Sequence, residues 1–263
     1  MSNSADSPVP PLREFRVESL QVQVFNTQAE MAKAVALAAR KVLQEALTKQ
    51  EAVSVIFAAA NSQVQSLDAL VALEGVDWTK LSMFHMDEYL GLEETHPASF
   101  RRFLRERVEK RIHPKAFHGI AGEADEPVSE CERYARLLAA QPIDLCLLGI
   151  GENGHIAFND PPVADFSDPH PVKLVKLDEA SRRQQVGEGH FPNLAAVPQF
   201  AYTLTIPALC AARQMLCIVP EQRKAQAVRD ALRGPLSTAC PASWLRRQAH
   251  CTLFLDSDSA SLL

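Results

Sequence analysis

Short apolar segments alternate with longer segments of helical periodicity along most of the chain. Residues 20–25 alternate apolar and polar positions, and several other segments are short apolar runs typical of buried strands. Because helices separate the strands, the pattern predicts an α/β fold in which a mostly parallel sheet carries helices on both faces. Strands are predicted at 20–25, 53–58, 81–86, 143–150, 172–177, 214–219 and 251–255, and helices at 28–48, after residue 63, and at 98–111, 127–140 and 223–232.

Length and composition fit one domain of this kind. Of the 263 residues, 47% are hydrophobic, which supports a sizeable core. Residues 1–13 are rich in Pro and Ser and lack the apolar core of a signal peptide. We therefore interpret them as a flexible N-terminal tail, followed by a single α/β domain over residues 14–263.

Charge and cysteine usage narrow the class of function. A net charge of −5 argues against a nucleic-acid partner, which needs a basic stripe, although a small anionic substrate needs only a few local cations. No apolar run is long enough to cross a bilayer, so no membrane association is expected. The six cysteines form no CxxC pair, which favours free thiols in a reducing cytoplasm over disulfides or zinc ligands.

One candidate site follows the strand at 143–150. The turn after this strand contains Gly151, Asn153, Gly154 and His155, and Asp160 lies five residues beyond the histidine. Open α/β sheets place their chemistry at the carboxyl ends of strands. A histidine flanked by an amide and a carboxylate can have its tautomer fixed and its charge tuned. A structural histidine in a tight turn would give the same local pattern.

A second candidate site follows the strand at 81–86, which runs directly into Asp87 and Glu88. In an extended backbone these two side chains point in opposite directions, so one can face a cleft while the other meets a cation or an amide. A partly desolvated carboxyl there can have a pKa suited to proton abstraction. A solvated pair in a loop is the alternative.

A third candidate site follows the strand at 53–58. Asn61, Ser62 and Gln63 come after three alanines, which would let a ligand approach the backbone. Asn61 or Ser62 can cap the next helix, whose amino end offers free N–H groups to an anion, and Lys224 could reach the same anion. On the local pattern alone, an ordinary helix cap and a solvated lysine are the better explanation of these residues.

Several motifs of other enzyme classes are missing. The turn at 61–63 has none of the glycines of a Walker loop or a dinucleotide fingerprint. The chain has no HExxH motif and no GxSxG motif, so neither a zinc site nor an α/β-hydrolase is predicted.

Two long motifs carry a resemblance to a known family. FHMDEYLGL (84–92), followed by HPASF (96–100), is similar to the FNMDEYVGL…HPxSY signature of glucosamine-6-phosphate deaminases. GIGENGHIAFNDP (149–161) is similar to their GxGxDGHIAFNEP, and a weaker similarity extends through VPQFAYTLTIPAL (197–209). The resemblance implies a modified Rossmann-like α/β sheet. It also implies conversion of glucosamine 6-phosphate to fructose 6-phosphate and ammonia, without a metal or redox cofactor.

The resemblance also implies roles for particular residues. Asp87 would be the general base that moves a proton between C2 and C1 of the open-chain sugar. His155 would open the pyranose ring, helped by Asn153 and Asp160. The phosphate would bind at the turn with Lys224. The substrate-binding residues expected on this basis are Asn61, Ser62, Gln63, Glu88, Gly151, Gly154 and Lys224.

The chain departs from the family pattern at several of these positions. Asn153 stands where many deaminases have Asp, Asp160 where they have Glu, and His85 where they have Asn. The glycine-rich PTGGTP phosphate loop is replaced by AAANSQ. These changes leave the identity of the amino-sugar phosphate open, and the phosphate-clamping Arg has no clear equivalent.

Two other functions remain as alternatives. A 6-phosphogluconolactonase shares the GxGxxGHxA turn, but such enzymes tend to carry DER and SLFP where this chain has DEY (87–89) and IAFN (156–159). A non-catalytic sugar-phosphate sensor that regulates transcription would need a DNA-binding segment, for which the 13-residue tail is too short. A small sugar phosphate is the expected partner, and a homo-oligomer is left open.

Overall fold

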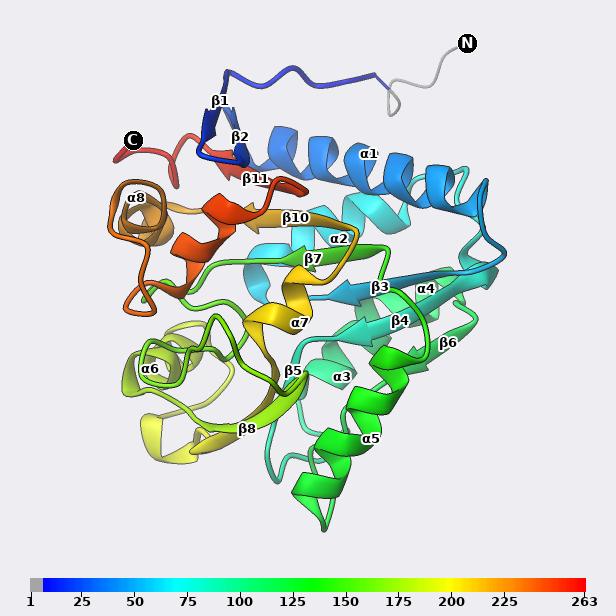
Figure 1. Cartoon of the computed structure of the whole chain (residues 1–263), viewed down its shortest axis with the longest axis vertical. Helices are drawn as coiled ribbons and strands as arrows, with labels where there is room; N and C mark the ends of the chain where they lie inside the picture. Colours follow the sequence, from blue (N-terminus) through cyan, green and yellow to red (C-terminus); the bar gives the residue numbers. More distant parts are fainter. Residues whose placement is uncertain (1–6) are drawn as a thin grey trace.

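The computed structural model describes residues 7–263, and its centre is a sheet of eight strands in the order β1-β2-β11-β10-β7-β3-β4-β6 (Figure 1). All neighbours pair in parallel except β1 and β2, which form an antiparallel hairpin at one edge. The mostly parallel α/β fold expected from the sequence is confirmed. The strands are β1 (Arg13–Val17), β2 (Leu20–Phe25), β3 (Val53–Phe57), β4 (Leu81–His85), β6 (Ala116–His118), β7 (Leu145–Leu148), β10 (Gln214–Val219) and β11 (Cys251–Asp256).

Helices cover both faces of this sheet because its strands are apolar on both sides. Along β10, Met215 and Cys217 belong to one buried cluster, whereas Leu216 and Ile218 belong to the other. This alternation follows from the two-residue period of a strand. One cluster is covered by α1 (Gln28–Leu47) and α2 (Val64–Val71), and the other by α5 (Pro127–Ala139), α7 (Ile206–Cys210) and α8 (Ala225–Arg233).

A smaller antiparallel sheet lies beside the central one, in the order β5-β9-β8. Its strands are β5 (Asp87–Tyr89), β8 (Val172–Lys176) and β9 (Phe200–Leu204). The strand predicted at 172–177 therefore exists, but the expectation that it pairs in parallel is wrong. It bonds to β9, the next strand in the chain, which also pairs with β5, the continuation of β4.

Other elements were not predicted from the apolar pattern. These are β1, β5, β6, β9, α7 and α6 (Glu179–Gly187). The helix predicted at 98–111 is divided into α3 (Phe100–Leu104), a π-helical turn over Arg105–Glu109 and α4 (Lys110–Ile112). The expected tail meets the fold at Arg13, where β1 begins, and its first six residues lie outside the described part of the chain.

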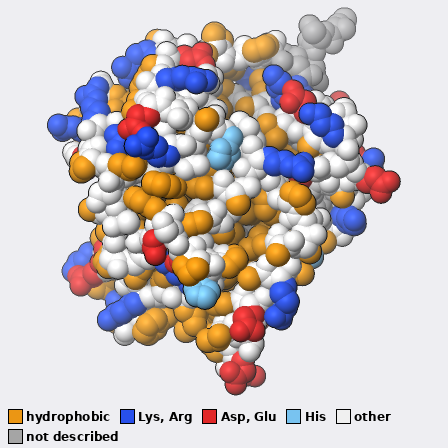
Figure 2. Space-filling view, in the orientation of Figure 1, with side chains coloured by type: hydrophobic (Ala, Val, Ile, Leu, Met, Phe, Trp, Pro, Cys, Tyr) orange, Lys and Arg blue, Asp and Glu red, His pale blue; other side chains and the backbone are white. Residues whose placement is uncertain are grey.

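The described residues contain no helix that is long and apolar enough to cross a membrane. On the face shown in Figure 2, Lys and Arg side chains are interspersed with Asp and Glu, and hydrophobic side chains gather near the middle. This face carries no continuous basic stripe of the kind that nucleic-acid binding requires.

Candidate active site

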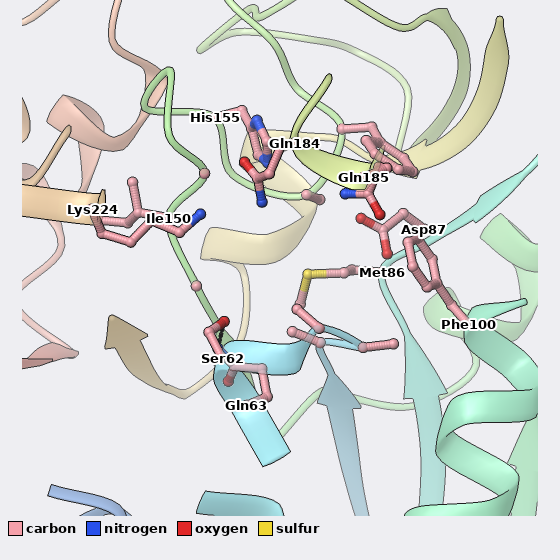
Figure 3. A pocket seen from close by; sticks show the side chains of 17 residues that line it. Ser62, Gln63, Met86, Asp87, Phe100, Ile150, His155, Gln184, Gln185 and Lys224 are labelled. Carbon is pink, nitrogen blue, oxygen red and sulfur yellow. Dashed lines mark hydrogen bonds between the residues drawn. The ribbon is translucent and has the colours of Figure 1, made fainter. Parts of the chain in front are cut away.

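A cavity lies at the carboxyl ends of β3, β4 and β7, the three strands after which the sequence predicted functional residues. Figure 3 shows Asp87 on one side of this cavity, Lys224 on the opposite side, and His155 between them on a third wall. The sequence-predicted residues on the wall are Ser62, Gln63, Asp87, Gly151, His155 and Lys224, and the other lining residues are Ala58, Ala59, Ala60, Met86, Phe100, Gly149, Ile150, Ala157, Phe158, Gln184 and Gln185.

Asp87 has a buried carboxyl group that forms no hydrogen bond to the described part of the protein. Its side chain lines the cavity, and the residue is only 8% exposed. Within residues 7–263, no hydrogen bond reaches its carboxylate. Burial, together with the neighbouring charge of Glu88, raises the pKa of Asp87 well above its usual value. Such a carboxyl is a strong base when ionised, and it is placed where it can take a proton from a bound ligand.

Glu88 points away from the cavity, as the alternation of a strand requires. Its carboxylate accepts hydrogen bonds from Ser99 Oγ at 2.8 Å, from Phe100 N at 3.1 Å and from Arg101 N at 3.0 Å. It therefore occupies the amino end of α3 and pairs with the Arg101 side chain, with 3.3 Å between the nearest nitrogen and oxygen. Burial raises the pKa of Glu88, against the lowering effect of these donors. The structure gives this residue a role in holding the fold.

The tautomer of His155 is fixed by three acceptors around one ring nitrogen. Nδ1 lies 2.8 Å from Asn153 Oδ1, 3.1 Å from Asp160 Oδ1 and 2.9 Å from Ser181 Oγ. Ser181 donates its own proton to Asp160, so its oxygen is free to accept. We therefore place a proton on Nδ1, which leaves Nε2 of the neutral ring as the acceptor.

Asp160 is the only carboxylate in this network, and it is fully partnered. It accepts from Asn153 Nδ2 at 3.0 Å and from the backbone of Asp178 at 3.1 Å, in addition to Ser181 and His155. Burial alone would raise the pKa of Asp160, but the hydrogen bonds from His155, Ser181 and Asn153 outweigh it, and the pKa lies below the usual value. An ionised Asp160 at this distance can stabilise a positive charge on the imidazole.

Two positions of the turn, Gly151 and Gly154, have no room for a side chain. A Cβ on Gly151 would lie 2.1 Å from the His155 ring, so only glycine lets the ring pack against this backbone. Gly154 has a φ of +83°, and a Cβ there would lie 2.7 Å from Cys240 Sγ. Gly154 thus shapes the turn but does not line the cavity.

The part of the cavity away from Asp87 is lined by Lys224 and by two residues of the turn at Asn61–Gln63, namely Ser62 and Gln63. Asn61 turns outward and donates to the carbonyl of Glu188 at 3.2 Å, so it is not on the wall. Lys224 is 2% exposed, and its ammonium makes no hydrogen bond within the described residues. Burial lowers the pKa of Lys224 to about 8, although nearby Glu188 opposes this. A buried ammonium that faces a cavity is suited to bind an anion.

The helix α6 contributes residues that the sequence reasoning missed. It brings Ser181 to His155 and places Gln184 and Gln185 on the cavity wall. Its start was signalled by Asp178 followed by Glu179, a common arrangement at a helix amino end. No group of three or more His, Cys, Asp or Glu residues in the described chain is arranged to hold a metal ion.

A family model described as glucosamine-6-phosphate isomerases/6-phosphogluconolactonase matches residues 26–254. The chain belongs to this family. A glucosamine-6-phosphate deaminase of Exiguobacterium sibiricum is 37% identical over 188 residues, which are 72% of this chain and 73% of the relative. A glucosamine-6-phosphate deaminase of Listeria welshimeri is 32% identical over 226 residues, which are 86% of this chain and 94% of the relative.

Solved structures of family members share the fold. A monomeric glucosamine-6-phosphate deaminase superposes with a TM-score of 0.83 at 28% identity, covering 92% of this chain and 99% of that one. A 6-phosphogluconolactonase of Shewanella baltica superposes with a TM-score of 0.75 at 18% identity, covering 92% of this chain and all of that one. The second likeness concerns the fold alone.

We expect Glu88→Gln to lower the free energy of unfolding by about 3 kcal/mol. The substitution breaks the buried ion pair with Arg101, and it places the amide N–H group of Gln among the donors that Glu88 now accepts from. The control is Glu123→Gln, which removes the more exposed partner of Arg101 and should cost far less. Thermal unfolding measures both. An unchanged Tm for Glu88→Gln, together with weaker ligand binding, would instead place Glu88 in contact with substrate.

Sulfate keeps two negative charges between pH 7 and pH 9, so it tests Lys224 directly. Because the pKa of Lys224 is about 8, its ammonium is lost as the pH rises through this range, and sulfate binding should weaken. Lys224→Arg keeps its charge and should bind sulfate with little dependence on pH. Titration calorimetry at constant ionic strength measures both. The same pH dependence in both proteins would assign the titrating group elsewhere.

Proposed function

We propose that this protein is a glucosamine-6-phosphate deaminase, which converts glucosamine 6-phosphate and water into fructose 6-phosphate and ammonia. The observation that carries this proposal is the pairing of two bases in one cavity. The Asp87 carboxylate and His155 Nε2 both lack protein partners within the described residues, and Lys224 lies at the other end. Its family membership and its deaminase relatives agree with this assignment.

The first step in this proposal is ring opening at His155. Nε2 takes the proton of the O1 hydroxyl while the C1–O5 bond breaks, and the imidazolium then returns a proton to O5. The proton that stays on Nδ1 is shared among Asn153, Ser181 and Asp160, so the ring holds its orientation in both charge states. The product is the open-chain aldehyde.

The second step is proton transfer at Asp87. The carboxylate removes the proton from C2 while O1 takes up a proton, which gives an enolamine. It then returns its proton to C1, and the nitrogen on C2 gives up a proton to become a neutral imine, so no proton is gained or lost overall. Water adds to C2 of this imine, and ammonia leaves from the resulting carbinolamine to give the ketone. Because Asp87 forms no hydrogen bond to the described protein, no donor weakens its basicity during these transfers. A phosphate bound near Lys224 and Ser62 would hold the reacting carbons in place.

Further properties follow from this assignment. We propose a cytoplasmic location, supported by six cysteines that are all unpaired, as expected in a reducing compartment. The deaminase activity does not by itself require an oligomer, because one solved relative is a monomeric deaminase. A small sugar phosphate is the partner, and nucleic acid is not.

Asp87→Asn should lower kcat for ammonia release at least about a hundredfold, because an amide cannot accept the proton from C2. Sulfate affinity should stay the same, since Lys224 is untouched. Asp258→Asn, at an exposed position, is the matched control and should keep full activity. Ammonia release and lactone hydrolysis are assayed side by side. Near-normal deamination by Asp87→Asn, or hydrolysis of 6-phosphogluconolactone alone, would refute the proposal.

His155→Gln should slow turnover of the cyclic amino sugar, because ring opening loses its proton carrier. Proton exchange into fructose 6-phosphate, followed in deuterated water with ammonia present, should suffer less, since the ketose reacts through its open-chain form. Equal losses in both assays would indicate that His155 serves a later step than ring opening. Full activity in both would make the turn structural.

A further inference from the structure

Gln185 carries a buried acceptor that the protein does not use. The residue is 6% exposed, and its side-chain oxygen has no hydrogen-bond partner within residues 7–263. Its neighbour Gln184 differs: Oε1 accepts from the backbone of Glu152 at 3.1 Å, and Nε2 donates to Glu188 at 2.8 Å. A buried polar atom without a partner is costly, so it marks a place where a ligand can supply the missing donor.

The position of Gln185 indicates which part of a ligand would supply that donor. Figure 3 shows its amide pointing towards Asp87, on the side of the cavity opposite Lys224. The other side chains at this end are apolar, among them Met86 and Phe100. Because Gln185 Oε1 is bonded to no donor of the described protein, a ligand can supply one, from the atoms next to those on which Asp87 acts.

These atoms are identified by the proposed function, on which this inference rests. Asp87 transfers a proton between C2 and C1, so the substituent on C2 lies next to its carboxylate. In an amino sugar this substituent is an amine, whose N–H groups can donate to both Gln185 and Asp87. We propose that Gln185 accepts a hydrogen bond from the C2 amino group and thereby determines the preference of this site for an amino sugar phosphate.

The test uses two ligands that lack a carbonyl and so cannot be turned over: 2-amino-2-deoxyglucitol 6-phosphate and 2-deoxyglucitol 6-phosphate. Calorimetry gives the ratio of their Kd values for each protein. The wild type should prefer the amine, and Gln185→Ala should reduce this preference about tenfold, the equivalent of one charge-assisted hydrogen bond. Gln185→Glu keeps an acceptor and should retain the preference. Arg183→Ala, at an exposed position of the same helix that does not line the cavity, should leave the ratio unchanged.

Two results would overturn the inference. If Gln185→Ala weakens both ligands equally, the residue only shapes the cavity. If Gln185→Glu loses the preference as Gln185→Ala does, the amide acts as a donor. Ammonia release is measured separately on the wild type. If the protein prefers the amine through Gln185 but releases no ammonia, only the deaminase proposal is refuted. If it releases ammonia but shows no such preference, only the role of Gln185 is refuted.

Discussion

The site depends on one constraint: two adjacent carboxyl groups on a short strand must find opposite environments. In β5, the side chains of Asp87 and Glu88 lie on opposite faces. Glu88 takes the N–H donors at the start of α3 and the Arg101 side chain, so its charge is compensated inside the fold. Asp87 receives no donor from the described chain and faces the cavity. The same two residues thus supply a structural anchor and an uncompensated carboxyl group, and the anchor fixes the backbone that positions this carboxyl in the cavity.

The regular part of the fold could be predicted because its elements are amphipathic or wholly apolar. The strands β2 and β10 begin and end where the pattern placed them, and α1 begins at the predicted residue, after Thr27, whose side chain accepts a hydrogen bond from Glu30 N. The small sheet could not be predicted in the same way. Its strand β5 has three residues and continues a buried strand, so it shows no period of its own. Antiparallel pairing there depends on tertiary contacts with β9, which local sequence does not record.

Some residues of the candidate site could be predicted from local sequence, and others could not. Asp87, His155 and Lys224 follow strands or open a helix, so their positions were signalled locally, and the structure brings them to one cavity. Ser181 and Gln185 are carried by α6, whose sequence EASRRQQVG is polar on most sides and has little apolar period. Their importance arises only when α6 crosses the strand ends, because Ser181 is 26 residues from the histidine that it contacts. Sequence spacing cannot indicate such a contact.

The packing of Gln63 explains how the turn at 61–63 can form without the glycines of the family's phosphate loop. Its side chain is 1% exposed, and Nε2 donates to the carbonyl of Ile218 at 3.1 Å, which ties the turn to the end of β10. A Cβ on Gly149 would lie 3.0 Å from that nitrogen, so the amide fills the space beside the strand end. Here a buried side chain fixes the turn that glycines would otherwise shape. The turn therefore presents Ser62 to the cavity without glycines, while Lys224 reaches the same cavity from the turn that precedes α8.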